Sequence, residues 1–175
     1  MAKLYFTGIK HSGKTTQARL VAQLLQMPHA DSDDLVLSMI DSPSVRDFYR
    51  EHGKDAFMEK EKEAVMAFAS ANESFILSLG GGAADNAHLM RFMAQTGRIV
   101  YLARAEKDML PVILKHGIPA FLDPDDLEGS FSRVFAKRDS IYRDMADLTI
   151  DLGPYGDREE TARMVMMKLK ENGYA

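Results

Sequence analysis

Residues 8–16, GIKHSGKTT, contain glycine, lysine and threonine at a spacing that could serve phosphate chemistry. Gly8 and Gly13 enclose four residues, and Lys14 and Thr15 follow, which satisfies the P-loop pattern G-x-x-x-x-G-K-[ST]. Glycines let the backbone wrap until successive N–H groups point at phosphate oxygens, and the N-terminus of the following helix adds its dipole. Lys14 then reaches the β- and γ-phosphates, and the Thr15 hydroxyl holds Mg²⁺. We therefore predict that the nucleotide is bound by Gly8, His11, Ser12, Gly13, Lys14, Thr15 and Thr16.

The rest of the sequence narrows the type of P-loop protein. A GTPase needs an Asn-Lys-x-Asp segment to read guanine, and the chain contains none. Motor and transporter ATPases usually end a buried strand in Asp or Asp-Glu, whereas the candidate strand FILSL runs into Gly80, Gly81 and Gly82. This favours a kinase-type site, which takes an acceptor hydroxyl, over an ATPase that positions water.

Two aspartates follow the short second strand. In HADSDD, Asp31 and Asp33 place carboxylates at the carboxyl edge of a parallel sheet, where α/β proteins bind ligands. The same residues would also suit the N-cap of the helix that begins at LVLSMI. Beside a P-loop we prefer the first interpretation, in which both carboxylates serve the ligand site.

Glu61 lies on the apolar stripe of a predicted helix, four residues from both Phe57 and Val65. A carboxylate on an apolar face is costly unless another group pairs with it. The alternative is a glutamate at the edge of that face, with its carboxylate in water.

Short apolar or β-branched runs alternate with longer segments of helical period, which is the pattern of a parallel sheet with helices on both faces. The predicted strands are residues 3–7, a short one that ends near 30, 75–79, 98–102 and 148–150. The predicted helices are one that starts at 14, then 34–40, 54–71, 86–94, 107–114, 130–145 and 158–170. We expect one α/β domain over residues 1–175. Its only candidate lid is 115–126, KHGIPAFLDPDD, where glycine and proline interrupt helical continuity.

Composition limits the partners and the compartment. The 175 residues include 26 acidic and 22 basic side chains, and the net charge of −4 argues against a general nucleic-acid binder. No cysteine is present, which is typical of a reducing compartment. No apolar run approaches the roughly 18 residues of a membrane span, and the N-terminus lacks the apolar core of a signal peptide. We expect a cytoplasmic monomer that binds a small-molecule acceptor, and neither nucleic acid nor membranes.

Five motifs, in order, resemble the shikimate kinase family across nearly the whole chain. They are GIKHSGKT at 8–15, DSD at 31–33, GKDAFMEKE at 53–61, LSLGGG at 77–82 and AKRDSIYR at 136–143. The resemblance implies a P-loop kinase of the nucleoside-monophosphate-kinase-like fold, with a five-stranded parallel sheet, a mobile acceptor-binding region at about 31–61 and a lid. Its cofactors would be ATP and Mg²⁺, and it would transfer the γ-phosphate of ATP to a hydroxyl of shikimate or a related acceptor.

The same resemblance assigns roles to single residues. Asp31 would complete the Mg²⁺ shell with Thr15, and Asp33 would bind the acceptor hydroxyl and act as its base. Taken alone, Arg138 would be interpreted as a solvated charge on a helix. The resemblance implies instead that Arg138 binds the acceptor carboxylate. The catalytic residues would be Lys14, Asp33 and Arg138. The acceptor site would comprise Asp33, Met58, Glu61, Gly80, Gly81, Gly82 and Arg138.

Two positions depart from the family pattern. Shikimate kinases usually carry an arginine where this chain has Met58, and that arginine pairs with the helical glutamate and clamps the acceptor carboxylate. Their lid usually reads Arg-Pro-Leu-Leu, whereas residues 118–121 read IPAF. Met and Ile supply neither the charge nor the forked geometry of an arginine. We therefore expect Glu61 to lack its partner unless Lys60 or Lys115 replaces it.

Three functions follow from these observations. The ordered motifs favour a kinase that phosphorylates shikimate. The missing arginines would suit a kinase for a polyol or sugar acid, as in the related gluconate kinases, or a nucleotide-binding protein without kinase activity. The three functions differ in whether the protein turns over ATP, and in which acceptor supports that turnover.

Overall fold

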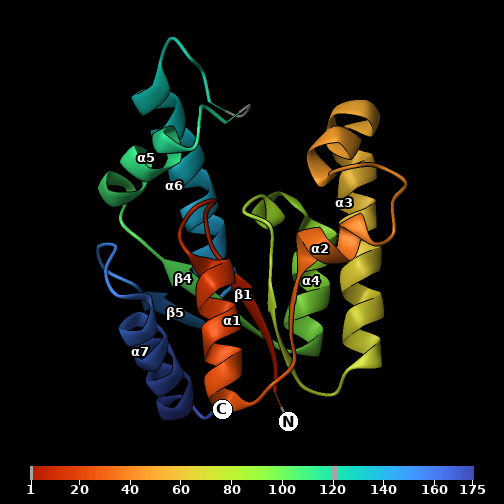
Figure 1. The fold of residues 1–175 in the computed structure, drawn as a ribbon, viewed down its shortest axis with the longest axis vertical. Helices are drawn as coiled ribbons and strands as arrows, with labels where there is room; N and C mark the ends of the chain where they lie inside the picture. Colours follow the sequence, from red (N-terminus) through yellow and green to blue (C-terminus); the bar gives the residue numbers. More distant parts are fainter. Residues whose placement is uncertain (1, 120–121) are drawn as a thin grey trace.

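The computed structural model describes residues 2–119 and 122–175, which contain a five-stranded parallel sheet (Figure 1). Its strand order is β2-β3-β1-β4-β5. The strands are β1 (Lys3–Thr7), β2 (His29–Asp31), β3 (Phe75–Ser78), β4 (Arg98–Ala103) and β5 (Leu148–Asp151). The five predicted strands are confirmed with ends that differ by at most one residue. Strands buried on both faces appear in a sequence as short apolar runs, which explains the agreement for β1, β3 and β4.

The helices also follow the predicted order, but the helix predicted at 34–40 lies at 32–37, a 3₁₀ helix at 83–85 was not predicted, and the helix predicted at 54–71 is part of a longer one. They are α1 (Lys14–Leu25), α2 (Ser32–Leu37), α3 (Val45–Ala71), the 3₁₀ helix η1 (Ala83–Asp85), α4 (Ala87–Thr96), α5 (Glu106–Lys115), α6 (Leu127–Met145) and α7 (Arg158–Glu171). The predicted helix 54–71 is only the second part of α3. A first part begins after the N-cap residue Ser44, and the two meet at a kink where Gly53 has φ 84° and ψ 178°. Because Gly53 is not helical, the predicted start at residue 54 agrees with the structure, and the helical segment before Gly53 is the part that was not predicted.

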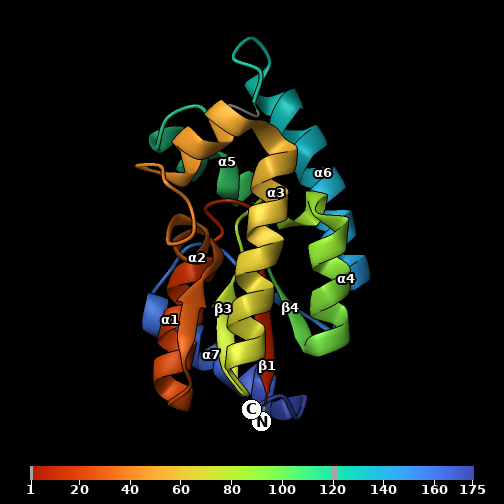
Figure 2. The same cartoon turned by 90° about the vertical axis from the view of Figure 1, so that its right-hand side faces the viewer.

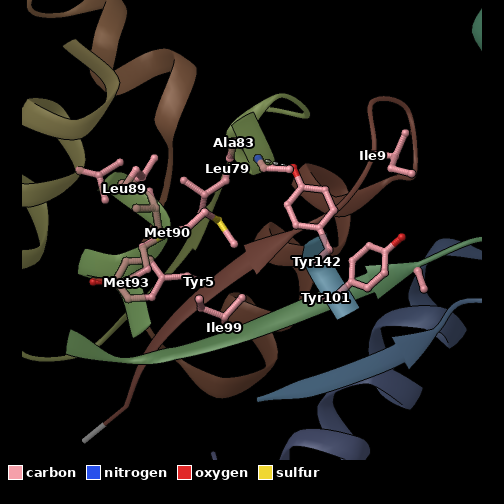
Figure 3. Packing of buried hydrophobic residues seen from close by; sticks show 14 of the residues in the cluster. Tyr5, Ile9, Leu79, Ala83, Leu89, Met90, Met93, Ile99, Tyr101 and Tyr142 are labelled. Atoms are coloured by element: carbon pink, nitrogen blue, oxygen red, sulfur yellow. Dashed lines mark hydrogen bonds between the residues drawn. The ribbon is translucent and has the colours of Figure 1, made fainter. Parts of the chain in front are cut away.

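Side chains alternate along the strands and form two apolar cores, one on each face of the sheet. Leu4 and Phe6 of β1 pack with side chains of α1 and α7. Tyr5, between them, packs with side chains of α3, α4 and α6. Figures 1 and 2 show these two layers of helices, and Figure 3 shows Tyr5 beside Met93 and Ile99. The expected sheet with helices on both faces is thus confirmed.

The carboxyl ends of β1, β2 and β3 lie at the same edge of the sheet because the strands are parallel neighbours. The loop before α1, the start of α2 and the glycine turn after β3 therefore meet there. The chain termini lie at the other end of the molecule (Figure 1). Of the expected lid, 115–126, Ala120 and Phe121 lie outside the described residues. None of the helices in the described part combines the length and the apolar character that crossing a membrane requires.

Candidate active site

The loop between β1 and α1 has the backbone that the P-loop pattern predicts. Gly13 is the N-cap residue of α1 and has a φ of 93°, a conformation that favours glycine. A Cβ on Gly8 would lie 2.8 Å from Ser12 Oγ, so that position also needs glycine. Within the described residues, Ser12 Oγ is buried without a hydrogen-bond partner, as expected of a hydroxyl that awaits a ligand. Lys14 is 7% exposed, and burial lowers the pKa of its ammonium group.

Asp31 is both a helix cap and a neighbour of the P-loop threonine. Its Oδ1 accepts a hydrogen bond from the backbone N–H of Asp33 at 2.9 Å, which caps α2. Its Oδ2 accepts from Thr15 Oγ1 at 3.0 Å and from Ser78 Oγ at 2.6 Å. The N-cap interpretation of HADSDD is therefore confirmed for Asp31, and its place beside Thr15 is compatible with the ligand-site interpretation.

The Thr15 and Asp31 oxygens suit Mg²⁺ rather than a metal held by protein groups alone. In the described part of the chain, no three His, Cys, Asp or Glu side chains gather in a metal-binding cluster. Mg²⁺ usually keeps several waters and binds one or two protein oxygens together with substrate phosphates. Two adjacent oxygens beside a phosphate loop meet that requirement.

A cavity of about 610 Å³ adjoins the P-loop and contains most of the predicted acceptor residues. They are Asp33, Glu61, Gly80, Gly81, Gly82 and Arg138. Asp33 lines this cavity and is exposed to solvent through it. Burial and the charge of Asp31 raise the pKa of Asp33, whereas Lys14 and Lys10 oppose the rise. A carboxylate with a raised pKa facing a cavity beside a phosphate loop suits a general base.

Glu61 is buried in the wall of this cavity, at 2% exposure, so its interpretation as an edge residue is wrong. Its Oε2 accepts a hydrogen bond from Asn86 Nδ2 at 3.1 Å. In the part of the chain that the structure describes, no Lys or Arg forms an ion pair with it, and Lys60 instead pairs with Glu63 at 2.7 Å. Burial is the main reason that the pKa of Glu61 rises to about 7, and the charge of Asp33 adds to the rise. The partner that sequence analysis missed is thus a neutral amide.

The glycine turn after β3 is held from both sides. A Cβ on Gly81 would lie 2.7 Å from the backbone nitrogen of Lys10, so the turn packs directly on the P-loop backbone. From α6, the buried hydroxyl of Tyr142 donates to the carbonyl of Gly81 and accepts from the N–H of Ala84, both at 3.2 Å. Figure 3 shows Tyr142 with its hydroxyl directed toward the segment after β3. Tyr142 therefore positions the turn, a role that sequence analysis did not find.

Arg138 lies on α6 and contacts a carboxylate that several cations share. Its Nη2 is 3.4 Å from Oδ2 of Asp85, which also pairs with Lys137 at 3.2 Å and Lys54 at 3.4 Å. Burial would raise the pKa of Asp85, but these cations outweigh it and lower the pKa. One carboxylate with three cations leaves a positive group beside the cavity, which favours an anionic acceptor.

A second cavity, of about 540 Å³, lies on the other side of the P-loop. Arg104, just after β4, and Tyr155, just after β5, line it, and the guanidinium carbon of Arg104 is 3.9 Å from the Tyr155 ring centroid. Both residues follow predicted strands and so lie at the carboxyl edge of the sheet. Sequence analysis could have used this position to predict that they line a ligand site. Five residues line both cavities: Lys10, His11, Lys14, Thr15 and His116.

Comparison with known proteins identifies the family. The family model described as "Shikimate kinase" matches residues 10–170. The chain belongs to the shikimate kinase family. This family consists of phosphotransferases that act on an alcohol group, so the predicted enzyme class and family are confirmed.

Individual shikimate kinases resemble the chain over nearly its whole length. The enzyme from Caldanaerobacter subterraneus is 29% identical over 173 residues, which cover 99% of each chain. The enzyme from Cupriavidus pinatubonensis is 28% identical over 171 residues, 98% of this chain and 88% of that protein. A solved structure of Acinetobacter baumannii shikimate kinase in complex with shikimate has a TM-score of 0.87 at 24% identity, covering 100% of this chain and 96% of that one. The predicted nucleoside-monophosphate-kinase-like P-loop fold is confirmed.

The two departures from the shikimate kinase pattern lie in different places. Met58 is on α3 and is not among the described residues that line the acceptor cavity, although its carbonyl accepts from Asn86 Nδ2 at 2.9 Å. Ile118 lines the cavity and is 50% exposed. Two cations that sequence analysis did not consider, Lys10 and Arg46, also line it. An anionic acceptor would therefore still meet positive charge in this cavity.

Proposed function

We propose that this protein phosphorylates a hydroxyl of shikimate with the γ-phosphate of ATP, using Mg²⁺. The observation that carries the proposal is the cavity in which Asp33, the glycine turn and Arg138 face the P-loop. In-line phosphoryl transfer needs mainly positioning and charge neutralisation, and these residues supply both. Asp33 accepts the proton of the attacking hydroxyl, since its raised pKa matches it to that task.

On the donor side, the P-loop residues bind the phosphates of ATP. Gly8, Ser12 and Gly13 belong to the loop that surrounds them, Lys14 neutralises their charge, and Thr15 and Asp31 would hold Mg²⁺. When bound there, Mg²⁺ would supply positive charge that offsets the negative charge developing during transfer. The nucleobase lies in the second cavity, where the guanidinium of Arg104 and the ring of Tyr155 offer flat surfaces.

On the acceptor side, the cations of the larger cavity bind the carboxylate of shikimate. Arg138 suits this best, because guanidinium groups bind carboxylates with two parallel hydrogen bonds. The backbone of the glycine turn and Glu61 border the rest of the acceptor. Met58 contributes through its carbonyl contact with Asn86, which also holds Glu61.

The proposal treats residues 1–175 as one kinase domain. Its acceptor-binding region is about 31–61 and its lid about 115–126. The protein acts as a cytoplasmic monomer on a small molecule. The absence of cysteine from the sequence agrees with a reducing compartment.

An ADP-release assay with ATP and Mg²⁺ tests the proposal. Its acceptors are shikimate, gluconate and buffer alone. We expect turnover only with shikimate, and a loss of about 10²-fold or more in Asp33→Asn, because general-base catalysis contributes that much. Asp34→Asn is the matched control, since Asp34 is exposed and is not among the described residues that line the cavity. Turnover of gluconate instead of shikimate would refute the assignment of shikimate as the acceptor. No turnover of either acceptor would refute the kinase activity.

A further inference from the structure

Asp85 lies directly beside Arg138. It is the last residue of η1 and is not among the described residues that line the acceptor cavity. Its backbone N–H donates to the carbonyl of Gly82 at 2.9 Å, which fixes Asp85 to the glycine turn. Its Oδ2 is 3.4 Å from Nη2 of Arg138, and a Cβ on Gly82 would lie 3.7 Å from that same nitrogen. The guanidinium at the edge of the cavity therefore contacts a carboxylate whose position the turn determines.

Two lysines share this carboxylate with Arg138. The Nζ of Lys137 is 3.2 Å from Oδ1 of Asp85, and the Nζ of Lys54 is 3.4 Å from Oδ2. Burial raises the pKa of Asp85, but the three cations outweigh it, so the pKa is lowered and the group is ionised at neutral pH. Three cations around one carboxylate leave the cluster positive. Asp85 can therefore hold Arg138 without cancelling the charge that attracts an anionic acceptor.

Lys54 connects this cluster to the acceptor-binding part of α3. It directly follows Gly53, where α3 has its kink, and the segment after the kink carries Glu61, which lines the cavity. Asp85 thus joins η1, α6 and α3 through side-chain contacts. The elements that carry the glycine turn, Arg138 and Glu61 are all linked through one carboxylate.

A fixed partner matters for Arg138 because an arginine side chain is long and has many rotamers. Ordering such a side chain when a ligand binds costs affinity. The side chain of Arg138 is 12% exposed and already in contact with Asp85 before any acceptor is present. A guanidinium has five N–H donors, so a contact at Nη2 leaves enough of them for two parallel hydrogen bonds with a carboxylate ligand.

We propose that Asp85 is a positioning residue that orients the guanidinium of Arg138 for the carboxylate of the acceptor. It touches neither the acceptor nor the phosphates and transfers no proton. The identity of the acceptor rests on the proposed function, whereas the orientation of Arg138 does not. Because the acceptor carboxylate does not react, loss of Asp85 weakens binding of the ground state and of the transition state alike. It therefore raises KM for the acceptor and leaves kcat and KM for ATP unchanged.

Steady-state kinetics of Asp85→Asn test the effect on the acceptor, since asparagine keeps the size of the side chain and removes its charge. KM for shikimate should rise about tenfold, as expected for the loss of a charge-assisted contact, with kcat and KM for ATP within about twofold of the native values. Asp147→Asn is the matched control. Asp147 also pairs with an arginine, Arg98 at 2.8 Å, and neither is among the described residues that line either cavity. An unchanged or lower KM in Asp85→Asn, or a loss confined to kcat, would overturn the inference.

NMR relaxation of the arginine Nε–H groups, without any ligand, tests the orientation directly. The signal of Arg138 is identified by its absence from the spectrum of Arg138→Lys. It should report an ordered side chain in the native protein and in Asp147→Asn, and a mobile one in Asp85→Asn. A mobile Arg138 in the native protein, or an equally ordered one in Asp85→Asn, would overturn the inference. Because no acceptor is present, this result stands if shikimate proves not to be the substrate, which the assay of the native protein decides separately.

Discussion

Replacing Glu61 by glutamine should stabilise the folded protein at pH 8 and change little at pH 5. Glu61 is 2% exposed and its carboxylate has no cation partner among the described residues. Glutamine has the same shape and can still accept the hydrogen bond of Asn86, which spans 3.1 Å. The substitution therefore removes the buried charge while it keeps the packing and the hydrogen bond.

The size of the effect follows from the pKa. The pKa of Glu61 is about 7 in the folded protein, against 4.5 for an ordinary glutamate, and this difference corresponds to about 3 kcal/mol. Below about pH 4.5 the carboxyl group is protonated in both states and contributes no pH dependence. Between about 4.5 and 7 the unfolded chain ionises while the folded chain does not, so stability falls as the pH rises. Above about 7 the full penalty is present.

Urea unfolding at pH 5 and pH 8 measures this contribution as a free energy of unfolding. Glu61→Gln should exceed the native protein by up to about 3 kcal/mol at pH 8, and by less than 1 kcal/mol at pH 5. Glu63→Gln is the matched control on the same helix. Glu63 is an exposed partner of Lys60, so its removal should cost less than about 1 kcal/mol at either pH. A Glu61→Gln protein that is no more stable than the native protein at pH 8 would refute the reasoning.

Three further predictions concern the acceptor cavity. Gly81→Ala should lower kcat/KM at least tenfold, because the added Cβ would lie 2.7 Å from the Lys10 nitrogen and displace the P-loop. The control Gly82→Ala, whose Cβ would have its nearest contact at 3.7 Å, should retain activity, and equal losses in the two variants would contradict the prediction. Tyr142→Phe should raise KM for shikimate and lower the free energy of unfolding by about 1–3 kcal/mol, because it leaves buried backbone groups of the glycine turn unpaired. An unchanged KM and an unchanged unfolding midpoint would count against this role of Tyr142. Met58→Arg should lower KM for shikimate, because it adds a cation one helical turn from the buried carboxylate, and a higher KM would exclude that role.

The local features of this protein could be predicted from its sequence. The P-loop is contiguous, so the types and spacing of Gly8, Gly13, Lys14 and Thr15 determine a phosphate site without knowledge of the rest of the chain. The strands β1, β3 and β4 could be predicted equally well, because each is a short apolar run that is buried on both faces. The first part of α3 was not predicted, and in the structure a kink at the non-helical Gly53 separates it from the second part.

The contacts that shape the acceptor site depended on the tertiary structure. Asn86 binds Glu61 from 25 residues away, and Tyr142 holds the glycine turn from 61 residues away. His116 meets His11 because α5 ends beside the P-loop. Such pairs have no sequence spacing to reveal them, because strand order and helix packing bring them together. The sequence by itself determined the fold class and the phosphate-binding end of the site. Only the folded chain decided which groups face the acceptor and how burial changes their charge.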